Sequence, residues 1–439
     1  MRARRFAVTL VSIVLVAVGG CSSANGSSGS TPIGGVRLYG SDGNTANSLG
    51  EAFKTPGAIS GMVGTAPLTP LSSDFQQRLK GIDPGISSYT YAGEAYDAVV
   101  ISALAVQLAR STDPAAAAKY INGVTILAPG GVECTTIKDC LDAINAGKDI
   151  AYRGVTVHSG FTDAGEPSTT SYGTLHFGRN NRIDDGKTEF VSAGNNEDAT
   201  KQAAPLPAAS GVKYKGDPLR YGLLLPKSGG LAALGPPIFD GAHLAIKEVN
   251  ELGGVLGKPI EYVDADDGTD PGKAGAALDG FIAQGIGFII GPSTSGSSAA
   301  LIPKAVAANR ILFSPSATSA ALTKADDHGL FFRTAPSDSY QSQALADVIM
   351  RGGARRVFIV ARKDSYGTGL LDGVSADLAA NGVKKSDIST ATYAPDQKDY
   401  TGVAQSAKDF HPDAVLVAGY EESAAVIAAL QKTDISFAH

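Results

Sequence analysis

Small polar side chains recur directly after short apolar runs of this sequence. If the runs are parallel strands of open α/β sheets, these side chains lie beyond the carboxyl ends of the strands, where such folds bind ligands. Taken singly, the serines and threonines are more typical of helix caps. Residues 41–43, taken alone, are typical of a turn. Their convergence from several loops favours a ligand site. The set contains hydroxyls, phenols and one carboxylate: Ser293, Thr294, Ser295, Ser316, Thr318, Tyr366, Tyr420 and Asp42.

Other stretches resemble known cofactor, metal or catalytic motifs, but each lacks residues or a placement that the motif requires. The glycines of 285–291 start and flank an apolar run instead of leading from a strand into a helix, so they do not predict a dinucleotide loop. The acidic stretch 264–270 lacks the closing glutamate of a calcium loop. None of the scattered histidines stands with a serine or cysteine in a nucleophile motif. We therefore expect no catalytic residue, no metal site and no cofactor.

The elements that would position these side chains are clearest after Leu219. Short apolar runs alternate there with helical patterns, which is typical of parallel sheets covered on both faces. The sequence therefore predicts an α/β fold of two doubly wound parallel-sheet lobes, divided near Pro336 and joined by a hinge. Predicted strands are 220–225, 260–264, 286–290, 311–314, 356–361, 388–393 and 414–418, and predicted helices are 239–252, one from Asp270, 296–308, 340–351, 368–381, 401–410 and 421–432.

The first half of the chain has a less regular pattern. A strand over 36–40 opens it, and the strongest helical pattern is the apolar run 92–109. Further helices are predicted over 115–121 and 137–146, and strand-like pieces over 155–157 and 174–177. Residues 195–218 are rich in Ala, Pro, Lys and Asn without periodicity, which predicts a linker.

The N-terminus has the composition of a targeting segment. Three arginines among the first five residues precede the apolar run 6–18, which is too short to span a bilayer comfortably. The run ends at Gly19-Gly20-Cys21, which resembles the lipobox of bacterial lipoproteins. We predict a signal peptide over 1–20, a lipid on Cys21, a flexible tether over 21–35 and an extracytoplasmic, membrane-anchored protein. An ordinary secretory signal with a chance cysteine is the alternative.

The remaining cysteines form an even pair. Cys134 and Cys140 are close in sequence, and an oxidising compartment favours a local disulfide between them. Two free thiols are the alternative. The 439 residues suffice for two lobes with separate cores, and a net charge of −6 argues against nucleic acid as a partner.

Several short motifs resemble the branched-chain amino acid binding proteins of ABC importers, which are type I periplasmic binding proteins. The resemblance covers nearly all of the chain after residue 35. The motifs are LLPKSG at 224–229, VNELGGVLG at 249–257, IGP at 290–292, SPSAT at 314–318, DSYG at 364–367, PDA at 412–414 and EAYDA at 94–98.

The order of these motifs departs from the family. Residues 219–439 resemble its N-terminal half, whereas 36–194 resemble its C-terminal half, so the chain looks circularly permuted. A fusion of two unrelated half-domains, or an intact copy preceded by a remnant, are the alternatives. Permutation predicts that strand 36–40 lies beside strand 414–418, because chain ends close together make such a rearrangement easy.

The resemblance also implies roles for the strand-end residues. Ser295 and Thr318 would bind an α-carboxylate through their hydroxyls. The backbone of Ser316, Tyr366 and Asp42 would bind an α-ammonium, with the Asp42 side chain as its counter-ion. A buried zwitterion needs both partners, because an unpaired buried charge costs several kcal/mol.

The side-chain pocket is implied by two further positions. Tyr420 would line the far wall, and Leu234 stands where many relatives place an aromatic residue. The resemblance implies a monomeric, non-enzymatic protein that captures an amino acid, of the branched-chain type first, for an ABC permease. A sensor of the same fold, an enzyme on the same scaffold, and a binder of an amide, urea or small aromatic solute are the alternatives.

Overall fold

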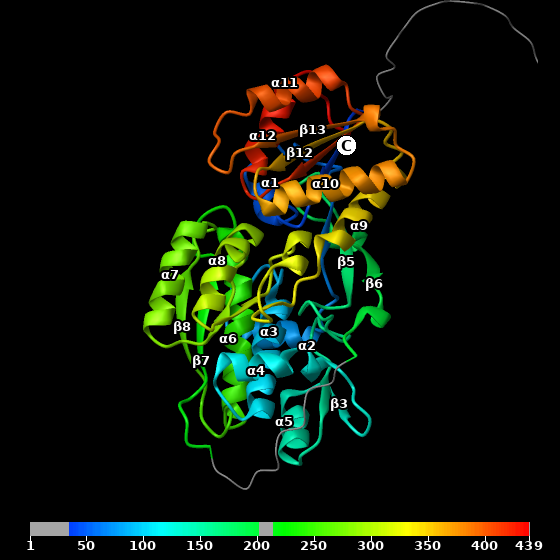
Figure 1. The fold of residues 1–439 in the computed structure, drawn as a ribbon. Helices are drawn as coiled ribbons and strands as arrows, with labels where there is room; N and C mark the ends of the chain where they lie inside the picture. The colour runs from blue at the N-terminus through cyan, green and yellow to red at the C-terminus, as the bar shows by residue number, and fades with distance from the viewer. Residues whose placement is uncertain (1–34, 202–213, 439) are drawn as a thin grey trace, which may run out of the picture.

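The computed structural model describes residues 35–201 and 214–438, which form two lobes stacked end to end (Figure 1). The five-stranded lobe contains a sheet in the order β11-β10-β9-β7-β8, with every neighbouring pair parallel. Alternate residues of the central strands face opposite sides, as the two-residue period of a strand requires. Its strands are β7 (Arg220–Leu225), β8 (Glu261–Asp266), β9 (Phe288–Ile290), β10 (Ile311–Ser314) and β11 (Phe331–Arg333).

Helices cover both faces of this sheet. On one face α7 (Pro271–Ala283) and α8 (Ser295–Ala307) pack together over Leu224 and its neighbours, and on the other lie α6 (Gly235–Glu251) and α3 (Ala92–Ala109). Helix α3 is apolar on all sides because it is a core helix. It is long and apolar enough to cross a membrane, yet 89% of it is buried inside the protein.

The seven-stranded lobe has the order β13-β12-β14-β1-β2-β5-β6. Helices α9 (Asp338–Arg351) and α10 (Ser365–Ala380) cover one face, and α11 (Thr401–Phe410) and α12 (Ser423–Gln431) the other. The predicted parallel sheet is present over β13-β12-β14-β1-β2, and β5 departs from it because it runs antiparallel to both β2 and β6. Its strands are β12 (Val357–Arg362), β13 (Ile388–Tyr393), β14 (Ala414–Ala418), β1 (Arg37–Gly40), β2 (Val63–Pro67), β5 (Thr169–His176) and β6 (Glu189–Gly194).

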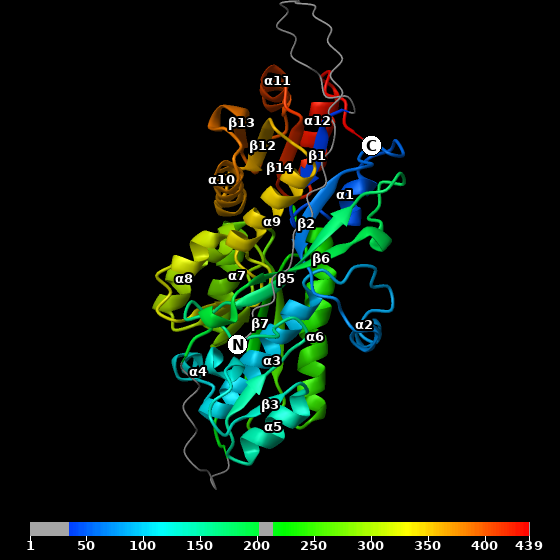
Figure 2. The ribbon, with the colours of Figure 1, turned by 90° about the vertical axis from the view of Figure 1, so that its right-hand side faces the viewer.

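The predicted neighbour of the first strand is confirmed. Strand β1 lies between β14 and β2 (Figure 2), parallel to both, with Arg37 opposite Ala414. The last described residues lie beside its start: Val36 N donates to Ser436 O at 2.7 Å, and Ala438 N donates to Val36 O at 2.8 Å. Segments from the two ends of the described chain therefore share one sheet.

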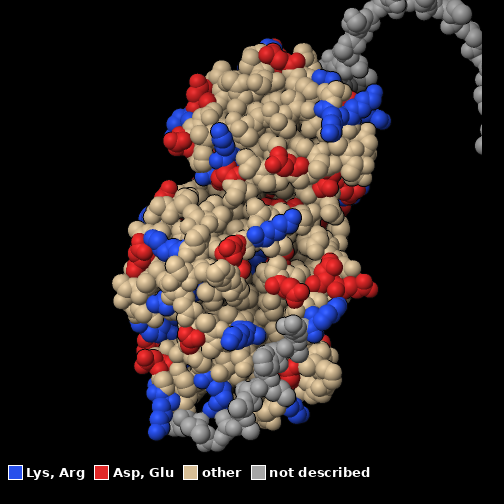
Figure 3. All heavy atoms as spheres, in the orientation of Figure 1, with Lys and Arg blue, Asp and Glu red and all other residues tan. Residues whose placement is uncertain are grey.

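Besides the passage from β6 to β7, described segments connect the lobes at three places. One follows β2 and leads to α2 (Ser73–Lys80), one at 162–168 leads to β5, and one at 334–337 joins β11 to α9. The last of these is the division predicted near Pro336. A crease separates the lobes in Figure 3, where acidic and basic side chains are interspersed on the visible face.

A small subdomain extends the five-stranded lobe away from the crease. It consists of α4 (Pro114–Ile121), α5 (Ile137–Asn145) and the parallel strands β3 (Val132–Cys134) and β4 (Ile150–Tyr152). The expected disulfide between Cys134 and Cys140 is present and links β3 to α5.

The strand-like piece predicted over 155–157 was wrong. The backbone N–H groups of Val155, Thr156 and Val157 donate instead to the buried Asp97 carboxylate, at 2.7–2.9 Å. A buried carboxylate needs several donors, and this local demand overrides the β-propensity of two valines. The predicted signal peptide, the lipid on Cys21 and most of the tether lie outside the described residues.

Candidate functional site

A cavity with about 310 Å³ of empty space lies where the two lobes meet. All seven predicted ligand residues line it, which places side chains far apart in sequence around one volume. From the seven-stranded lobe come Asp42, Gly43, Tyr366 and Tyr420, and from the five-stranded lobe come Tyr91, Leu231, Leu234, Ile238, Ser293, Ser295, Ser316 and Thr318. A larger, open groove along residues 52–58 and 431–437 contains none of these residues.

The five-stranded lobe supplies hydroxyl groups at its strand ends. Thr294 caps helix α8 by accepting a hydrogen bond from Ser297 N at 3.0 Å, so the cap interpretation holds for this residue. Ser295 is the first residue of the helix, 2% exposed, and its hydroxyl accepts from Ser319 N at 3.0 Å. Ser316 donates to Ser293 O at 3.1 Å. Oriented N–H groups and hydroxyls at a helix start favour an anionic ligand group.

The seven-stranded lobe supplies the carboxylate. Asp42 follows β1 and is 6% exposed. Its two oxygens accept from the hydroxyls of Tyr366 and Tyr91, each at 2.7 Å. Burial raises the pKa of Asp42, while the hydrogen bonds from the two tyrosines lower it. Among the described residues that line the cavity, none carries a positive charge, so a cationic ligand group is the complement of this carboxylate.

A second buried acid lies next to the cavity and was missed by sequence analysis. Asp338 begins α9 and is 2% exposed, and neither carboxyl oxygen has a hydrogen bond of ordinary geometry. Its N–H donates to Thr318 O at 2.7 Å. Burial and the charge of Asp42 raise the pKa of Asp338 well above its ordinary value. Of the two acids, Asp338 therefore holds its proton more tightly, which favours the charge on Asp42.

Stacked aromatic rings form one wall. Tyr366 and Tyr420 stack with ring centroids 5.2 Å apart and an interplanar angle of 19°. The Arg362 guanidinium lies 4.6 Å from the Tyr420 centroid and pairs with Glu422 at 3.0 Å. Cation–π contact and ion pairing together hold the Tyr420 ring in place.

Aliphatic side chains form the opposite wall. Leu234 was expected here, and the structure adds Leu231 and Ile238, all three 7% exposed or less. Leu231 lies in the loop after β7, and Ile238 lies in the first turn of α6. Their spacing in the sequence did not predict that they share a surface. The wall is apolar and small, so it suits a short aliphatic group.

Tyr91 was also missed. It precedes α3 with φ 60°, a left-handed conformation that is uncommon for a non-glycine residue. The nearby Tyr96, in the EAYDA motif, lies outside the cavity lining, and its hydroxyl donates to Glu248 at 2.6 Å. The positive φ turns the chain before the helix, and a sequence pattern does not reveal such a turn.

Direct hydrogen bonds close the cavity on its outer side. The Ser319 hydroxyl donates to Ser365 O at 2.9 Å, and Glu421 N donates to Gly230 O at 3.3 Å. Each bond joins one lobe to the other. The lobes are therefore in direct contact near the cavity.

Comparisons with known proteins agree with this architecture. The model of the family described as Periplasmic binding protein matches residues 218–438. The Leu/Ile/Val-binding protein BraC3 of Rhizobium johnstonii is 33% identical over 214 residues, which are 48% of this chain and 57% of that protein. The leucine-specific-binding protein of Salmonella typhimurium is 29% identical over 224 residues, 51% of this chain and 54% of that protein.

The chain thus spans about half the length of the curated relatives it matches. Among solved structures, it is similar to the branched-chain amino acid transporter substrate binding protein LivJ from Streptococcus pneumoniae in complex with isoleucine. The identity is 29% and the TM-score 0.43, over 50% of this chain and 63% of that one.

Proposed function

This chain belongs to the periplasmic binding protein family, and we propose that it captures an amino acid, of the branched-chain type, between its two lobes. In this proposal it is an extracytoplasmic solute-binding protein of an ABC importer. The observation that carries it is the placement of one carboxylate and a set of hydroxyls on facing walls of one enclosed cavity.

The charges of a free amino acid match the two walls. The Asp42 carboxylate is the counter-ion of the α-ammonium, assisted by backbone groups of Ser316 and Tyr366. Ser295 and Thr318 bind the α-carboxylate through hydroxyls and N–H groups. Pairing both ends offsets the cost of burying a zwitterion.

The remaining walls select the side chain. Leu231, Leu234 and Ile238 would contact an aliphatic side chain, and Tyr420 would close the opposite side. The cavity is small, and these walls are apolar. A branched aliphatic side chain fills such a space without leaving an unpaired polar group.

Calorimetry of the mature protein against a panel of amino acids, amides, urea and small aromatic acids tests the proposal. We expect leucine, isoleucine or valine to bind most tightly. Binding restricted to a ligand without an α-ammonium group would reject the amino-acid assignment while leaving a solute-binding role.

Capture would be coupled to the movement of the lobes. A ligand that contacts both walls favours the closed arrangement over an open one, and a membrane permease can recognise the closed surface. The proposed lipid on Cys21 would keep the protein at the membrane. Replacing Cys21 by serine should release it into the soluble fraction, and continued membrane association would refute the anchor.

We also propose the circularly permuted order of the two halves. The parallel pairing of β1 with β14 and the adjacency of Val36 and Ser436 support it. A rearranged chain that starts at Tyr214, continues through Ala438 into Gly35 by a short linker and ends at Lys201 should fold and bind like the original. A rearranged chain that is unfolded would contradict this order.

A further inference from the structure

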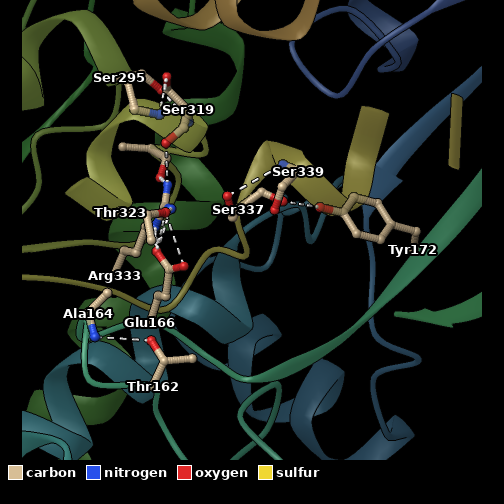
Figure 4. A network of polar contacts seen from close by, with 12 residues as sticks. Thr162, Ala164, Glu166, Tyr172, Ser295, Ser319, Thr323, Arg333, Ser337 and Ser339 are labelled. Carbon is tan, nitrogen blue, oxygen red and sulfur yellow. Dashed lines mark hydrogen bonds and ion pairs between the residues drawn. The ribbon is translucent and has the colours of Figure 1, made fainter. Parts of the chain in front are cut away.

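A buried ion pair lies beneath the hydroxyl side of the cavity (Figure 4). Arg333, at the end of β11, is 1% exposed, and Glu166 is 7% exposed. Arg333 Nε donates to Glu166 Oε2 at 2.8 Å, and Nη2 donates to the same oxygen at 2.5 Å. Neither residue is part of the cavity lining, so the pair acts on the site only through other residues.

The other donors of Arg333 hold the loop that carries Thr318. Nη1 donates to Ala317 O at 3.1 Å and to Ser319 O at 2.9 Å, the carbonyls on either side of Thr318. Nη2 also donates to Thr323 Oγ1 at 2.8 Å. All five donors of the planar guanidinium are thus used, a pattern that the three donors of a lysine cannot reproduce.

The loop that Arg333 holds contacts both the Ser295 hydroxyl and the opposite lobe. Ser319 N donates to the Ser295 hydroxyl at 3.0 Å, and the Ser319 hydroxyl donates to Ser365 O at 2.9 Å (Figure 4 shows the Ser295–Ser319 contact). Fixing the Ser319 carbonyl therefore orients Ser319. This residue contacts Ser295, which is proposed to bind the ligand carboxylate, and it also bonds to the opposite lobe.

The pair also ties this loop to the hinge. Glu166 lies on the connecting segment 162–168, and Arg333 directly precedes the connecting segment 334–337. A buried ion pair adds little net stability compared with apolar residues of the same volume, because desolvation offsets the attraction. Its directional bonds do specify one geometry, which suits a role in arranging the loop.

We propose that Arg333 and Glu166 are positioning residues of the ligand site, which fix residues 315–319 so that Thr318 and Ser295 face one ligand carboxylate. The identity of the ligand rests on the proposed function. The fixing of the loop is a property of the protein before ligand binds, so it can be tested separately.

Hydrogen–deuterium exchange of the unliganded Arg333→Lys protein provides that test. Lysine keeps the charge next to Glu166 but loses the two-carbonyl contact, so exchange over 315–319 should rise by about tenfold, with β12 unchanged. Arg356→Lys is the matched control, because Arg356 pairs with Asp387 at 3.1 Å on the seven-stranded lobe. If Arg333→Lys does not fold, Glu166→Gln replaces it. Unchanged exchange over 315–319, or an equal rise across the whole lobe, would overturn the proposal.

Ligand affinity gives a second, independent readout. For the amino acid that the wild-type protein binds, Arg333→Lys should raise Kd by roughly tenfold. In a Thr318→Ala background the same change should raise Kd by a smaller factor, because part of the effect of Arg333 passes through Thr318. A full effect in the Thr318→Ala background would contradict this route. If the wild-type protein binds no amino acid, the proposed function fails, and the exchange experiment alone decides the positioning role.

Discussion

The Tyr91 hydroxyl donates a 2.7 Å hydrogen bond to Asp42 from the opposite lobe. Asp42 belongs to the loop after β1, whereas Tyr91 precedes a core helix of the five-stranded lobe. The same contact therefore stabilises the charge of Asp42 and joins the lobes. The Asp42 carboxylate is therefore oriented before a ligand binds, by the Tyr91 hydroxyl on one oxygen and the Tyr366 hydroxyl on the other.

Tyr91→Phe should weaken amino-acid binding by roughly five- to thirtyfold, because a charge-assisted hydrogen bond contributes about 1–2 kcal/mol. Calorimetry measures the change. Tyr96→Phe is the matched control, since the Tyr96 hydroxyl contacts Glu248 outside the cavity lining and its loss should leave Kd unchanged. Equal effects of the two variants would show that Tyr91 does not support the site.

Replacement of Asp338 by asparagine should affect ligand binding much less than the same replacement of Asp42. Burial and the Asp42 charge raise the pKa of Asp338 well above its ordinary value, which favours the protonated form that asparagine imitates. We expect Asp338→Asn to bind the ligand within about threefold of the wild-type affinity at neutral pH. A loss as large as that caused by Asp42→Asn would mean that Asp338 carries the charge.

Acidification should weaken binding of an α-ammonium ligand. Burial raises the pKa of Asp42, and only its ionised form is a counter-ion, so affinity should fall as pH falls through that raised pKa. The decline should begin above the ordinary aspartate value of about 3.9. Titrations at a series of pH values measure it, and an affinity that stays constant until the protein unfolds would refute the proposed ion pair.

Glu94 should make the folded state less stable at higher pH. Burial raises the pKa of Glu94 from 4.5 to about 8, so the folded protein retains a proton that the unfolded chain has lost. The associated stability is complete below the unfolded value and is lost as pH rises toward 8. Between the two pKa values, the stability falls by roughly 1.4 kcal/mol per pH unit.

Glu94→Gln should therefore flatten the pH dependence of the free energy of unfolding across this range. Urea denaturation at a series of pH values measures it, with the exposed Glu51→Gln as control. An unchanged slope in Glu94→Gln would show that this group does not titrate with folding.

Reduction of the disulfide should affect stability without affecting binding. Cys134 and Cys140 close a short loop, with a sequence separation of 6, in the subdomain at the far end of the five-stranded lobe (Figure 2). Chain entropy predicts a loss of about 2 kcal/mol in the Cys134→Ser/Cys140→Ser protein. Its Kd should match that of the wild-type protein below the unfolding transition. A changed Kd would imply coupling between this subdomain and the cavity.

Local patterns were sufficient for much of the fold. The strands over 311–314, 388–393 and 414–418 and the helices over 92–109 and 401–410 match the structure residue for residue, because each has a strong period and clear end signals. The strand-end rule identified six of the predicted ligand residues that line the cavity, whereas Leu234 was implied by the resemblance alone.

The missed features depend on contacts that are distant in sequence. Asp338 lies beside the cavity because the connecting segment 334–337 brings the start of α9 to Thr318, and Ile238 contributes to the apolar wall from the first turn of α6. The antiparallel direction of β5 depends on how the segment 162–168 enters the seven-stranded lobe, which the local sequence does not encode. In 155–157, the Asp97 carboxylate redirects the backbone, although the local sequence favours a strand.

Calorimetric titration of Asp42→Asn with the best amino-acid ligand tests the central claim most directly. Asp149→Asn is its matched control, because both aspartates are 6% exposed and Asp149 lies outside the cavity lining. The account predicts a loss of about 2–5 kcal/mol, a factor of about 30 or more in Kd, for Asp42→Asn and none for Asp149→Asn. An Asp42→Asn protein that is folded and binds as tightly as the wild-type protein would contradict it.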